Sequence, residues 1–349
     1  MNFSGRILIS RTDNIGDVIL TFPMIGLLKR KYPEAQIYFL GKTYTKHLIK
    51  LNKNIRGFLN YDELVAKTEE KQIAYLKSFG FDVVIHVFPR KDIAKICKKA
   101  RIRKRIGTAH RIYHWFTCNK LVFFSRKRSN LHEAQLNIKL LKPFKIKIPP
   151  LNEIHLYYDL KKPSLDDDKK IVDYYYEKIN IDNFIDPNRI NLIIHPKSKG
   201  SAIEWGLNNF AELLELLPEN KYKIFMTGTK AEGELLKDFS QLYKDKITDV
   251  TGIFDLEQLI YFISITDGLI AASTGPLHIA AALGKFTVGI FSPTRPIFPK
   301  RWAPLGRNAK YVVNTNCKPT KGDDCVTSIE AKKVREIIYN FFENQPKQK

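Results

Sequence analysis

The stretch LIAASTGPLHIAAALG, residues 269–284, carries the clearest structural signal in the chain. Its apolar run (269–272) predicts a buried strand, its Gly-Pro pair predicts a break, and the alanine-rich run after it predicts a helix from about Leu277. A helix that starts directly after a strand presents free backbone N–H groups and the positive end of its dipole, which together favour a phosphate. The same pattern also occurs in ordinary strand–helix connections, so this stretch alone leaves both interpretations open.

Strand-like and helix-like segments alternate along the rest of the chain. RILIS (6–10) is followed by a turn and an apolar helix face, and DVVIHV (82–87), INLIIHP (190–196) and YKIFMTG (222–228) repeat the pattern. This alternation predicts parallel, doubly wound sheets, and 349 residues are more than one ordinary core holds. We therefore predict an α/β protein of two doubly wound, Rossmann-like domains facing across a cleft, with ligands at the carboxyl ends of the strands.

Composition suggests where the domains meet. Residues 149–187 are rich in Pro, Asp and Lys and are expected to form the junction, with one helix at about 165–179. The predicted domains are 1–160 and 161–327. A C-terminal helical segment, 328–349, follows, for which packing back on the first domain is one option.

Positive charge is concentrated in the first half of the chain. Residues 1–150 contain 31 Lys and Arg and 10 Asp and Glu, a net charge of +21, whereas residues 151–349 contain 27 and 26, a net charge of +1. Such asymmetry points to an acidic partner of the first half: nucleic acid, an anionic lipid surface or a phosphorylated substrate. A merely solubilising surface would not explain why only one half is charged.

The most basic tract, residues 90–128, interleaves aromatic with basic side chains. It contains 14 Lys and Arg against the single acid Asp92, and it includes HRIYHWF (110–116). Such a tract can bind nucleic acid, lie at a membrane interface, or bind sugars and phosphates. It carries no recognised nucleic-acid-binding motif.

Cysteine usage and hydropathy indicate a cytoplasmic protein. Four cysteines in 349 residues do not suggest a disulfide scaffold. Cys317 and Cys325 flank a polar loop without a nearby histidine, which gives a zinc site little support. No apolar run approaches the ~18 residues needed to span a bilayer, and the first residues lack the pattern of a secretory signal.

Taken together, four blocks resemble the lipopolysaccharide heptosyltransferase family, glycosyltransferase family 9, which has the GT-B fold of two Rossmann-like domains. Their order and spacing cover nearly the whole chain, which is far more specific than any one block. The blocks are RTDNIGDVILTFP (11–23), HPKSKGSAIEWGLNNF (195–210), TGTKAEGE (227–234), and STGPLHIAAALG (273–284) with the following SPTRP and RWAPLG.

The resemblance implies an inverting, metal-independent glycosyltransferase without a cofactor. It would transfer a sugar, typically heptose from ADP-heptose, onto a lipopolysaccharide core or a similar phosphorylated, lipid-linked acceptor. Asp17 would be the general base on the acceptor hydroxyl, and Glu232 would lie near the nucleoside of the donor. The donor diphosphate would be held by the turn and helix start made of Ser273, Thr274, Gly275, Pro276 and His278.

The chemistry of such a transfer requires these residue types, but each also has an ordinary structural explanation. A departing nucleoside diphosphate needs fixed hydrogen-bond donors, and the attacking hydroxyl needs a nearby base. Asp17, however, could simply cap the helix that follows it. Glu232 could be an exposed helix acid, and His278 could be a packed histidine. The co-occurrence of the four blocks favours the functional interpretation.

Two positions depart from the family pattern on the donor side. The family often has Lys or Arg where this chain has Ile203, so Lys197 or Lys199 of the same loop would have to supply the positive charge. Many members also have Asp where this chain has Ser273, a weaker and neutral partner for sugar hydroxyls. Both departures put the identity of the donor sugar in doubt more than the fold, and they leave open an altered or reduced activity.

We expect the basic half to bind an anionic, lipid-linked saccharide acceptor at the inner face of the cytoplasmic membrane, as a peripheral protein, and we expect no nucleic-acid partner. The candidate acceptor-binding residues are Arg11, Asn14, Arg90, Lys91, Arg111 and Arg126. Two alternatives remain: another nucleotide-sugar enzyme on the same fold, such as an epimerase, and a basic nucleic-acid-binding protein, which would bind generic DNA or RNA with a steep salt dependence.

Overall fold

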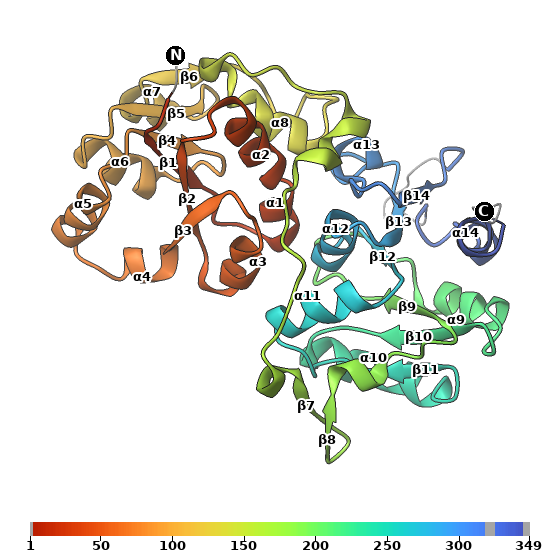
Figure 1. The fold of residues 1–349 in the computed structure, drawn as a ribbon. Helices are drawn as coiled ribbons and strands as arrows, with labels where there is room; N and C mark the ends of the chain where they lie inside the picture. Colours follow the sequence, from red (N-terminus) through yellow and green to blue (C-terminus); the bar gives the residue numbers. More distant parts are fainter. Residues whose placement is uncertain (1–2, 318–324, 345–349) are drawn as a thin grey trace. The chain divides into compact units, whose positions relative to one another are not determined.

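The structure is a computed structural model that describes residues 3–317 and 325–344. The chain divides into two compact units, Met1–Lys161 and Lys162–Lys349 (Figure 1). Each unit is built on a six-stranded, wholly parallel sheet.

The first unit has the strand order β3-β2-β1-β4-β5-β6. Its strands and helices are β1 (Arg6–Ser10), α1 (Ile15–Ile19), α2 (Phe22–Lys31), β2 (Gln36–Gly41), α3 (Lys46–Lys50), β3 (Ile55–Asn60), α4 (Tyr61–Val65), α5 (Glu69–Ser78), β4 (Val83–His86), α6 (Lys91–Lys99), β5 (Lys104–Thr108), α7 (Ile112–Thr117), β6 (Lys120–Val122) and α8 (Glu133–Lys139).

Alternation along the central strands of the first unit sends side chains into two apolar layers. Leu8 of β1 and Val84 of β4 join a buried cluster with side chains of α4, α5 and α6. On β2, Phe39 meets Phe22 of α2 edge to face at 6.4 Å. The apolar helix face expected after the first turn belongs to two helices, α1 and α2, which are separated at Leu20–Thr21. Pro23 lies in the first turn of α2, where its missing N–H costs nothing.

The second unit has the equivalent order β11-β10-β9-β12-β13-β14. Its strands and helices are β7 (Ile171–Tyr174), β8 (Glu177–Asn180), β9 (Ile190–His195), α9 (Leu207–Leu216), β10 (Tyr222–Met226), α10 (Lys230–Leu242), β11 (Ile247–Asp249), α11 (Leu256–Ile265), β12 (Gly268–Ala272), α12 (Gly275–Ala282), β13 (Phe286–Phe291), α13 (Pro299–Trp302), β14 (Ala309–Val313) and α14 (Ala331–Phe342). Both strand orders are those of doubly wound Rossmann folds.

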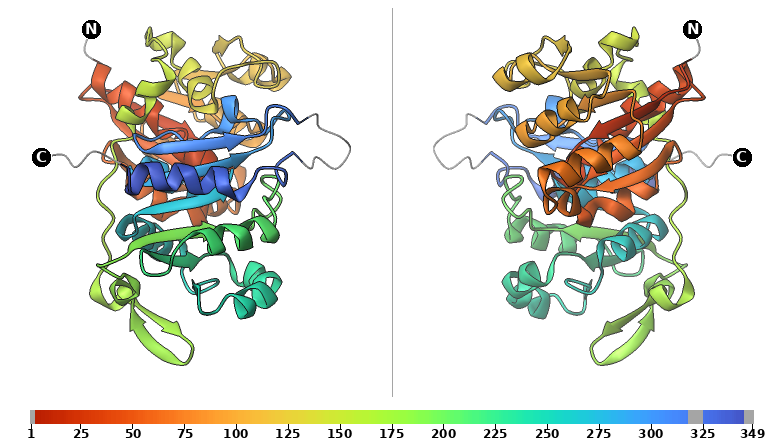
Figure 2. Two further views of the ribbon diagram at one scale, coloured as in Figure 1. Left: turned by 90° about the vertical axis from the view of Figure 1, so that its right-hand side faces the viewer. Right: turned by 90° about the vertical axis from the view of Figure 1, so that its left-hand side faces the viewer.

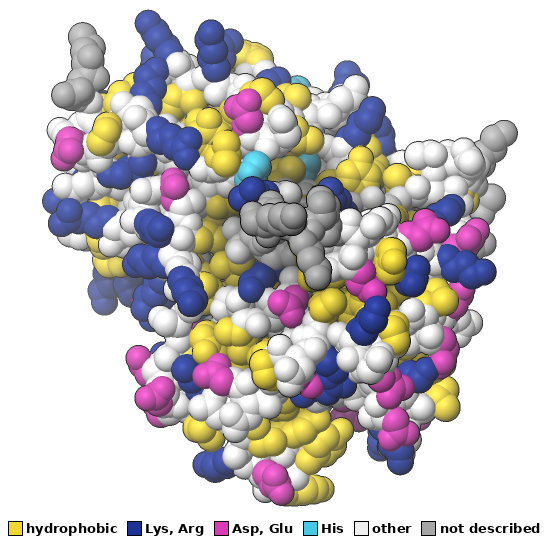
Figure 3. Space-filling model, turned by 45° about the vertical axis from the view of Figure 1, so that its right-hand side comes forward, with side chains coloured by type: hydrophobic (Ala, Val, Ile, Leu, Met, Phe, Trp, Pro, Cys, Tyr) yellow, Lys and Arg dark blue, Asp and Glu magenta, His cyan; other side chains and the backbone are white. Residues whose placement is uncertain are grey.

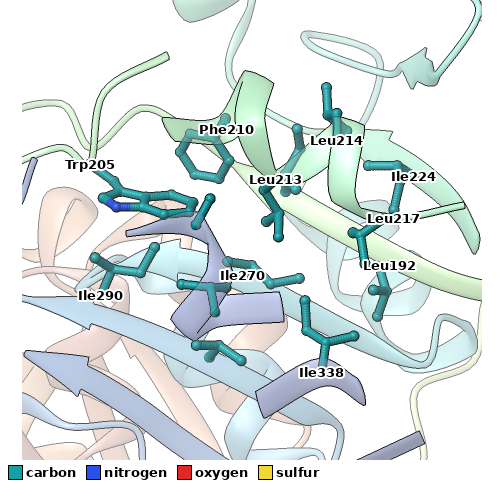
Figure 4. Close-up of a cluster of buried hydrophobic side chains, with 14 of the residues drawn as sticks. Leu192, Trp205, Phe210, Leu213, Leu214, Leu217, Ile224, Ile270, Ile290 and Ile338 are labelled. Atoms are coloured by element: carbon teal, nitrogen blue, oxygen red, sulfur yellow. The ribbon is translucent and has the colours of Figure 1, made fainter. Parts of the chain in front are cut away.

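A large apolar cluster holds α9 and α14 against one face of the second sheet (Figure 4). The fully buried Trp205 lies in this cluster, and its indole N–H donates to the Ile329 carbonyl at 2.8 Å. Val334 and Ile338 of α14 pack in the same cluster. The buried face of the C-terminal helix therefore belongs to the second unit, which differs from the option that it packs back on the first.

Residues 165–179 do not form the predicted helix. A short 3-10 turn, Asp167–Lys170, leads into the antiparallel hairpin of β7 and β8, which projects from the second unit (Figure 2). Cys317 and Cys325 are joined in a disulfide that the sequence analysis did not predict, while Cys97 and Cys118 are free. Among the described residues, no helix is both long and apolar enough to cross a membrane.

Candidate active site

In the first unit, the strand order changes direction between β1 and β4, and their carboxyl ends lie side by side. Ser10 pairs with His86 in register, and the amide of Val87 donates to the Ser10 carbonyl at 3.0 Å. Doubly wound sheets bind ligands outside this position, because the two neighbouring connections leave toward opposite faces of the sheet. The segment that follows β1 carries Arg11 and Asp17.

Arg11 is the centre of a buried charge network. Its Nε donates to Asp13 at 2.7 Å, and its two terminal nitrogens donate to the carboxylate of Asp17, to Asn137 at 3.1 Å and to Glu133 at 3.4 Å. Burial by itself would lower the pKa of Arg11, but the three carboxylates raise it above its usual value. Arg11 therefore stays charged, and its guanidinium is fully engaged by protein groups.

Asp17 is held by this network rather than by the helix terminus. It is the third residue of α1, whose N-cap position is occupied by Asn14, so the interpretation of Asp17 as a helix cap is wrong. Its side chain is 16% exposed and accepts from Arg11. The pKa of Asp17 is raised from 3.8 to about 6: burial raises it most, the negative charges of Asp13 and Glu133 also raise it, and Arg11 opposes them.

The charge balance of the network adds to the effect of burial on the pKa of Asp17. Three carboxylates share two guanidinium groups, those of Arg11 and Arg126, so one negative charge is left without its own cation in a poorly hydrated place. A carboxylate with a pKa near the working pH is well suited to general-base catalysis, because it is mostly ionised yet still binds a proton strongly.

Two residues of α8, Glu133 and Asn137, hold the two guanidinium groups of the network in place by hydrogen bonds. The buried Glu133 accepts from Arg11 and from Arg126, and Asn137 accepts from both guanidiniums while its amide donates to the Leu20 carbonyl at 2.9 Å. More than a hundred residues separate α8 from α1 along the chain, and the sequence analysis missed both residues. No local signal marks them, although Glu133 is the only acid between Asp92 and Glu153.

The candidate acceptor-binding residues fall into two groups. Arg11 is buried among the side chains described above, and Arg126 donates to Glu133, to Asn137 and to the Val87 carbonyl. This burial does not fit the prediction that Arg11 contacts the acceptor, since its side chain is 3% exposed. Asn14, Lys91 and Arg111 are exposed at the surface.

Arg90 and Lys91 line an open hollow with a volume of about 700 Å³ at the start of α6. The Arg90 guanidinium lies 4.4 Å from the centre of the Tyr61 ring and donates to Asp92 at 3.2 Å. Lys95, which the sequence analysis did not select, lines the same hollow. The two predicted residues are thus placed beside each other in a depression whose lining also includes the acids Glu69 and Asp92.

In the second unit, the strand order changes direction between β9 and β12. Ala271 pairs with His195 in register, so the turn before α12 and the loop after β9 leave the sheet side by side. Thr274 occupies the N-cap position of α12, with Gly275 and Pro276 as the first helical residues. The expected strand and helix within 269–284 are confirmed, except that the helix begins at Gly275 rather than at Leu277, so the Gly-Pro pair forms its first turn instead of a break before it.

The hydroxyl of Thr274 makes no hydrogen bond. It is buried, its side chain does not cap α12, and its Oγ1 has no partner among the described residues. Ser273, Gly275 and Pro276 are partly exposed, whereas His278, one turn into α12, is buried. A buried hydroxyl at a helix N-terminus therefore retains both a donor and an acceptor for a ligand.

Glu232 is neither exposed nor simply a helix acid. It is 6% exposed and closes a capping box with Thr229, whose backbone N–H donates to the Glu232 carboxylate at 2.8 Å. Beside it, the His195 ring contacts Thr227 Oγ1 at 3.0 Å. Burial lowers the pKa of His195, and the charge of Glu232 opposes that effect. His195 is a polar group at this edge that the sequence analysis did not select, although it opens one of the four blocks.

The loop after β9 contains the two candidate lysines. Lys197 is partly buried and pairs with Glu204 at 2.9 Å, while Lys199 is exposed and lies in the left-handed region with φ of 49°. Ile203, which stands where the family often has a cation, packs against the apolar cluster around Trp205. In the described part of the chain, no group of three or more His, Cys, Asp or Glu side chains is placed to hold a metal ion.

Two doubly wound units with polar side chains gathered at each switch point define the class of protein, an α/β ligand-binding protein of the GT-B kind. The family model of glycosyltransferase family 9 (heptosyltransferase) matches residues 70–329. The chain belongs to this family, and it is an enzyme of the glycosyltransferase class.

Individual relatives agree with this assignment. The chain is 23% identical to lipooligosaccharide heptosyltransferase 2 of Campylobacter jejuni, with 95% of this chain and 96% of the relative covered. A glycosyltransferase family 9 structure from Veillonella parvula superimposes with a TM-score of 0.77 at 17% identity, covering 99% of both chains. The ADP-heptose lipopolysaccharide heptosyltransferase II of Escherichia coli superimposes with a TM-score of 0.71 at 18% identity, covering 95% of this chain and 97% of that one.

Proposed function

We propose that this protein transfers a sugar, heptose from ADP-heptose, onto a phosphorylated, lipid-linked saccharide, with inversion and without a metal ion. Family membership supports a heptosyltransferase, and the E. coli relative named above uses ADP-heptose. The observation that carries the proposal is the start of α12, where the buried Thr274 hydroxyl has no partner among the described residues.

The donor diphosphate binds at the start of α12. The backbone N–H groups of the first turn and the Thr274 hydroxyl donate to the phosphates, and the helix dipole stabilises their negative charge. Lys197 and Lys199 add positive charge from the neighbouring loop in place of the missing cation at Ile203. Because these donors are fixed in position, they stabilise the charge that develops on the leaving nucleoside diphosphate.

Glu232 binds the nucleoside end of the donor. Oε2 of Glu232 is occupied by the capping box with Thr229. The carboxylate is thereby held rigidly at the carboxyl edge of the sheet, where its remaining acceptor capacity serves ribose hydroxyls. Ser273 and His278 adjoin the diphosphate and the sugar.

Asp17 acts as the general base on the acceptor hydroxyl. Arg11 positions its carboxylate, and the raised pKa keeps the group ready to take a proton. As the hydroxyl oxygen bonds to the anomeric carbon of the sugar, the bond from that carbon to the diphosphate breaks and the hydroxyl proton passes to Asp17. One displacement of this kind inverts the anomeric centre.

The basic first half binds the anionic acceptor and the membrane that holds it. Its net charge of +21 favours the binding of phosphates. On the face of the first unit that Figure 3 shows, Lys and Arg side chains are more frequent than Asp and Glu side chains. Arg90, Lys91 and Arg111 contact the acceptor phosphates, with Asn14 and Arg126 nearer to the base. We place the protein at the cytoplasmic face of the membrane as a peripheral enzyme.

Nucleotide binding tests the proposal before the acceptor is known. A ligand that binds only the folded state at a hundred times its dissociation constant stabilises it by ~2.7 kcal/mol. We expect ADP to raise the melting temperature and UDP to raise it less. Generic DNA stabilising the protein while ADP and ADP-heptose do not would contradict the proposal.

A further inference from the structure

Helix α7 exposes its apolar face and buries its polar one. The side chains of His114 and Thr117 point into the first unit and are buried. Ile112 and Phe116, which lie four positions apart on the other face, are 80% and 71% exposed, and Trp115 beside them is more than half exposed. This is the reverse of the usual arrangement for a surface helix.

The exposed face of α7 continues onto the segment after the edge strand β6. Phe123 is 70% exposed, and its ring meets the Trp115 ring edge to face at 5.9 Å. The indole N–H of Trp115 donates to the Ala109 carbonyl at 2.9 Å, so the tryptophan needs no polar partner from outside. We call Ile112, Trp115, Phe116 and Phe123 the α7 patch.

The segment that carries the α7 patch is basic and contains no acid. Residues 100–132 contain nine Lys and Arg and no Asp or Glu. The exposed cations among them are Arg101, Arg103, Arg111, Lys120, Lys127 and Arg128. Arg111 directly precedes α7 and Lys120 lies in β6, so positive charge borders the patch from two elements.

We propose that the α7 patch inserts into an anionic lipid bilayer, with its four apolar side chains at the boundary between headgroups and acyl chains. Arg111, Lys120 and their basic neighbours then contact the lipid phosphates. An apolar surface bordered by Lys and Arg and containing Trp is the pattern of an interfacial membrane anchor. The inference deepens the proposed action on a lipid-linked acceptor and rests on it for its biological purpose.

Charge argues against a second copy of this chain as the occupant. A two-fold contact through the α7 patch would bring two basic borders together, and like charges brought together cost free energy. A nucleic acid would match the charge and could stack on Trp115, but Ile112, the most exposed of the four, offers no stacking surface. An anionic bilayer satisfies both the charge and the aliphatic side chain.

The test is co-sedimentation of the full chain with vesicles that contain phosphatidylglycerol and phosphatidylcholine but no acceptor. The variant Ile112→Ser/Phe116→Ser removes apolar surface and leaves every charge in place. Its matched control is Leu235→Ser/Leu242→Ser on α10, where the two leucines are 70% and 74% exposed and lie in the second unit. Circular dichroism verifies that both variants fold.

We expect the patch variant to lose vesicle affinity by on the order of tenfold for each side chain replaced. This factor corresponds to the free energy of transferring one large apolar side chain out of water. The control should bind as the wild type does. Brominated phosphatidylglycerol should quench wild-type tryptophan emission and quench Trp115→Phe much less, because of the other two tryptophans Trp205 is fully buried and Trp302, in the second unit, is only partly exposed.

Equal vesicle affinity of patch variant and wild type would overturn the inference, as would an equal loss in the control. A dimer that the patch variant alone abolishes, with lipid binding unchanged, would assign the patch to a protein interface instead. Transfer to a detergent-dispersed acceptor measures the proposed function separately. Activity there without vesicle binding would refute only the membrane anchor, and vesicle binding without activity would refute only the transferase.

Discussion

The variant Asp17→Asn distinguishes between two roles for Asp17, that of a general base and that of a residue that only stabilises the fold. The substitution keeps the size of the side chain and a hydrogen-bond acceptor for Arg11, but it removes the charge and the ability to take a proton. Because general-base assistance contributes typically ~10²–10⁴-fold, we expect turnover to fall by that factor. Affinity for ADP should be unchanged, because the donor is assigned to the second unit.

The same substitution has a predictable effect on stability against pH. The pKa of Asp17 is raised from 3.8 to about 6 in the folded protein. The folded state therefore binds this proton more tightly than the unfolded state, so the contribution is fully present below about pH 4 and is lost as the pH rises through 6. With ~1.4 kcal/mol for each pKa unit, the ionised form costs on the order of 3 kcal/mol of folding free energy at neutral pH.

Chemical denaturation of wild type and Asp17→Asn at several pH values measures this effect. The wild type should lose about 3 kcal/mol relative to the variant between pH 4 and pH 7, because the asparagine does not titrate. Asp62→Asn is a suitable control, since hydrogen bonds from Thr43 lower the pKa of Asp62. The stability difference between wild type and Asp62→Asn should stay nearly constant from pH 4 to pH 7 and should change below about pH 4, with the wild type losing stability as the pH falls.

Activity gives the second half of the test. The wild-type kcat/KM should fall as the pH drops through about 6, where Asp17 becomes protonated and unable to accept the hydroxyl proton. A folded Asp17→Asn protein with near-normal turnover would refute the assignment of the base. If the difference in unfolding free energy between wild type and Asp17→Asn does not change with pH, the description of the charge network is refuted.

Three further predictions concern the start of α12, Glu232 and the binding of the whole chain to membranes. Gly275→Val places a branched side chain at the first residue of α12 and should weaken ADP binding about tenfold or more, because one or two charge-assisted hydrogen bonds are lost. Calorimetric titrations should show a smaller effect on adenosine binding. Equal ADP affinity in the folded variant would exclude this turn as the diphosphate site. Glu232→Gln should weaken ADP binding at a nearly unchanged melting temperature, whereas Glu232→Ala should also lower the unfolding free energy by ~1 kcal/mol, because it opens the capping box. Vesicle binding of the whole chain should weaken as salt rises, since each Lys or Arg at an anionic surface contributes ~1 kcal/mol that ions screen; equally strong binding to pure phosphatidylcholine would speak against an electrostatic contribution.

The parts of the structure that the sequence predicted are those encoded by local patterns. The switch from strand to helix at 269–284 was legible because an apolar run, a Gly-Pro break and an alanine run follow one another. The repeated alternation of such units predicted two doubly wound sheets, and both have the expected parallel order.

Errors arose where local signals conflicted. The stretch from Leu165 begins with acids and continues with lysines, as a helix does, but its IVDYYY run has the β-branched and aromatic side chains of a strand. The hairpin turns at Tyr175 and Tyr176, both with positive φ, without the Gly or Asn that usually signals such a turn. The strand preference of the run prevailed over the helix-like start.

The charge network could not be predicted because its members are distant in sequence. Arg11 was predicted to bind the acceptor, yet its side chain contacts Glu133 and Asn137, which are 122 and 126 residues away in the sequence. Only the folded sheet brings α8 to the end of β1. The role of Asp17 was inferred from its block, but its raised pKa depends first on burial by the rest of the fold and in part on Glu133, which the block does not contain.

Product analysis with ADP-heptose tests the central claim most directly. The protein is incubated with ADP-β-heptose and a detergent-dispersed lipopolysaccharide core that lacks its outer sugars, ADP release is followed, and the anomeric configuration of the product is read by NMR. We predict that ADP is released only when the acceptor is present, that the new linkage is α, and that Asp17→Asn forms it ~10²–10⁴-fold more slowly. A β-linked product, or ADP-heptose left intact with every core acceptor offered, would contradict the account.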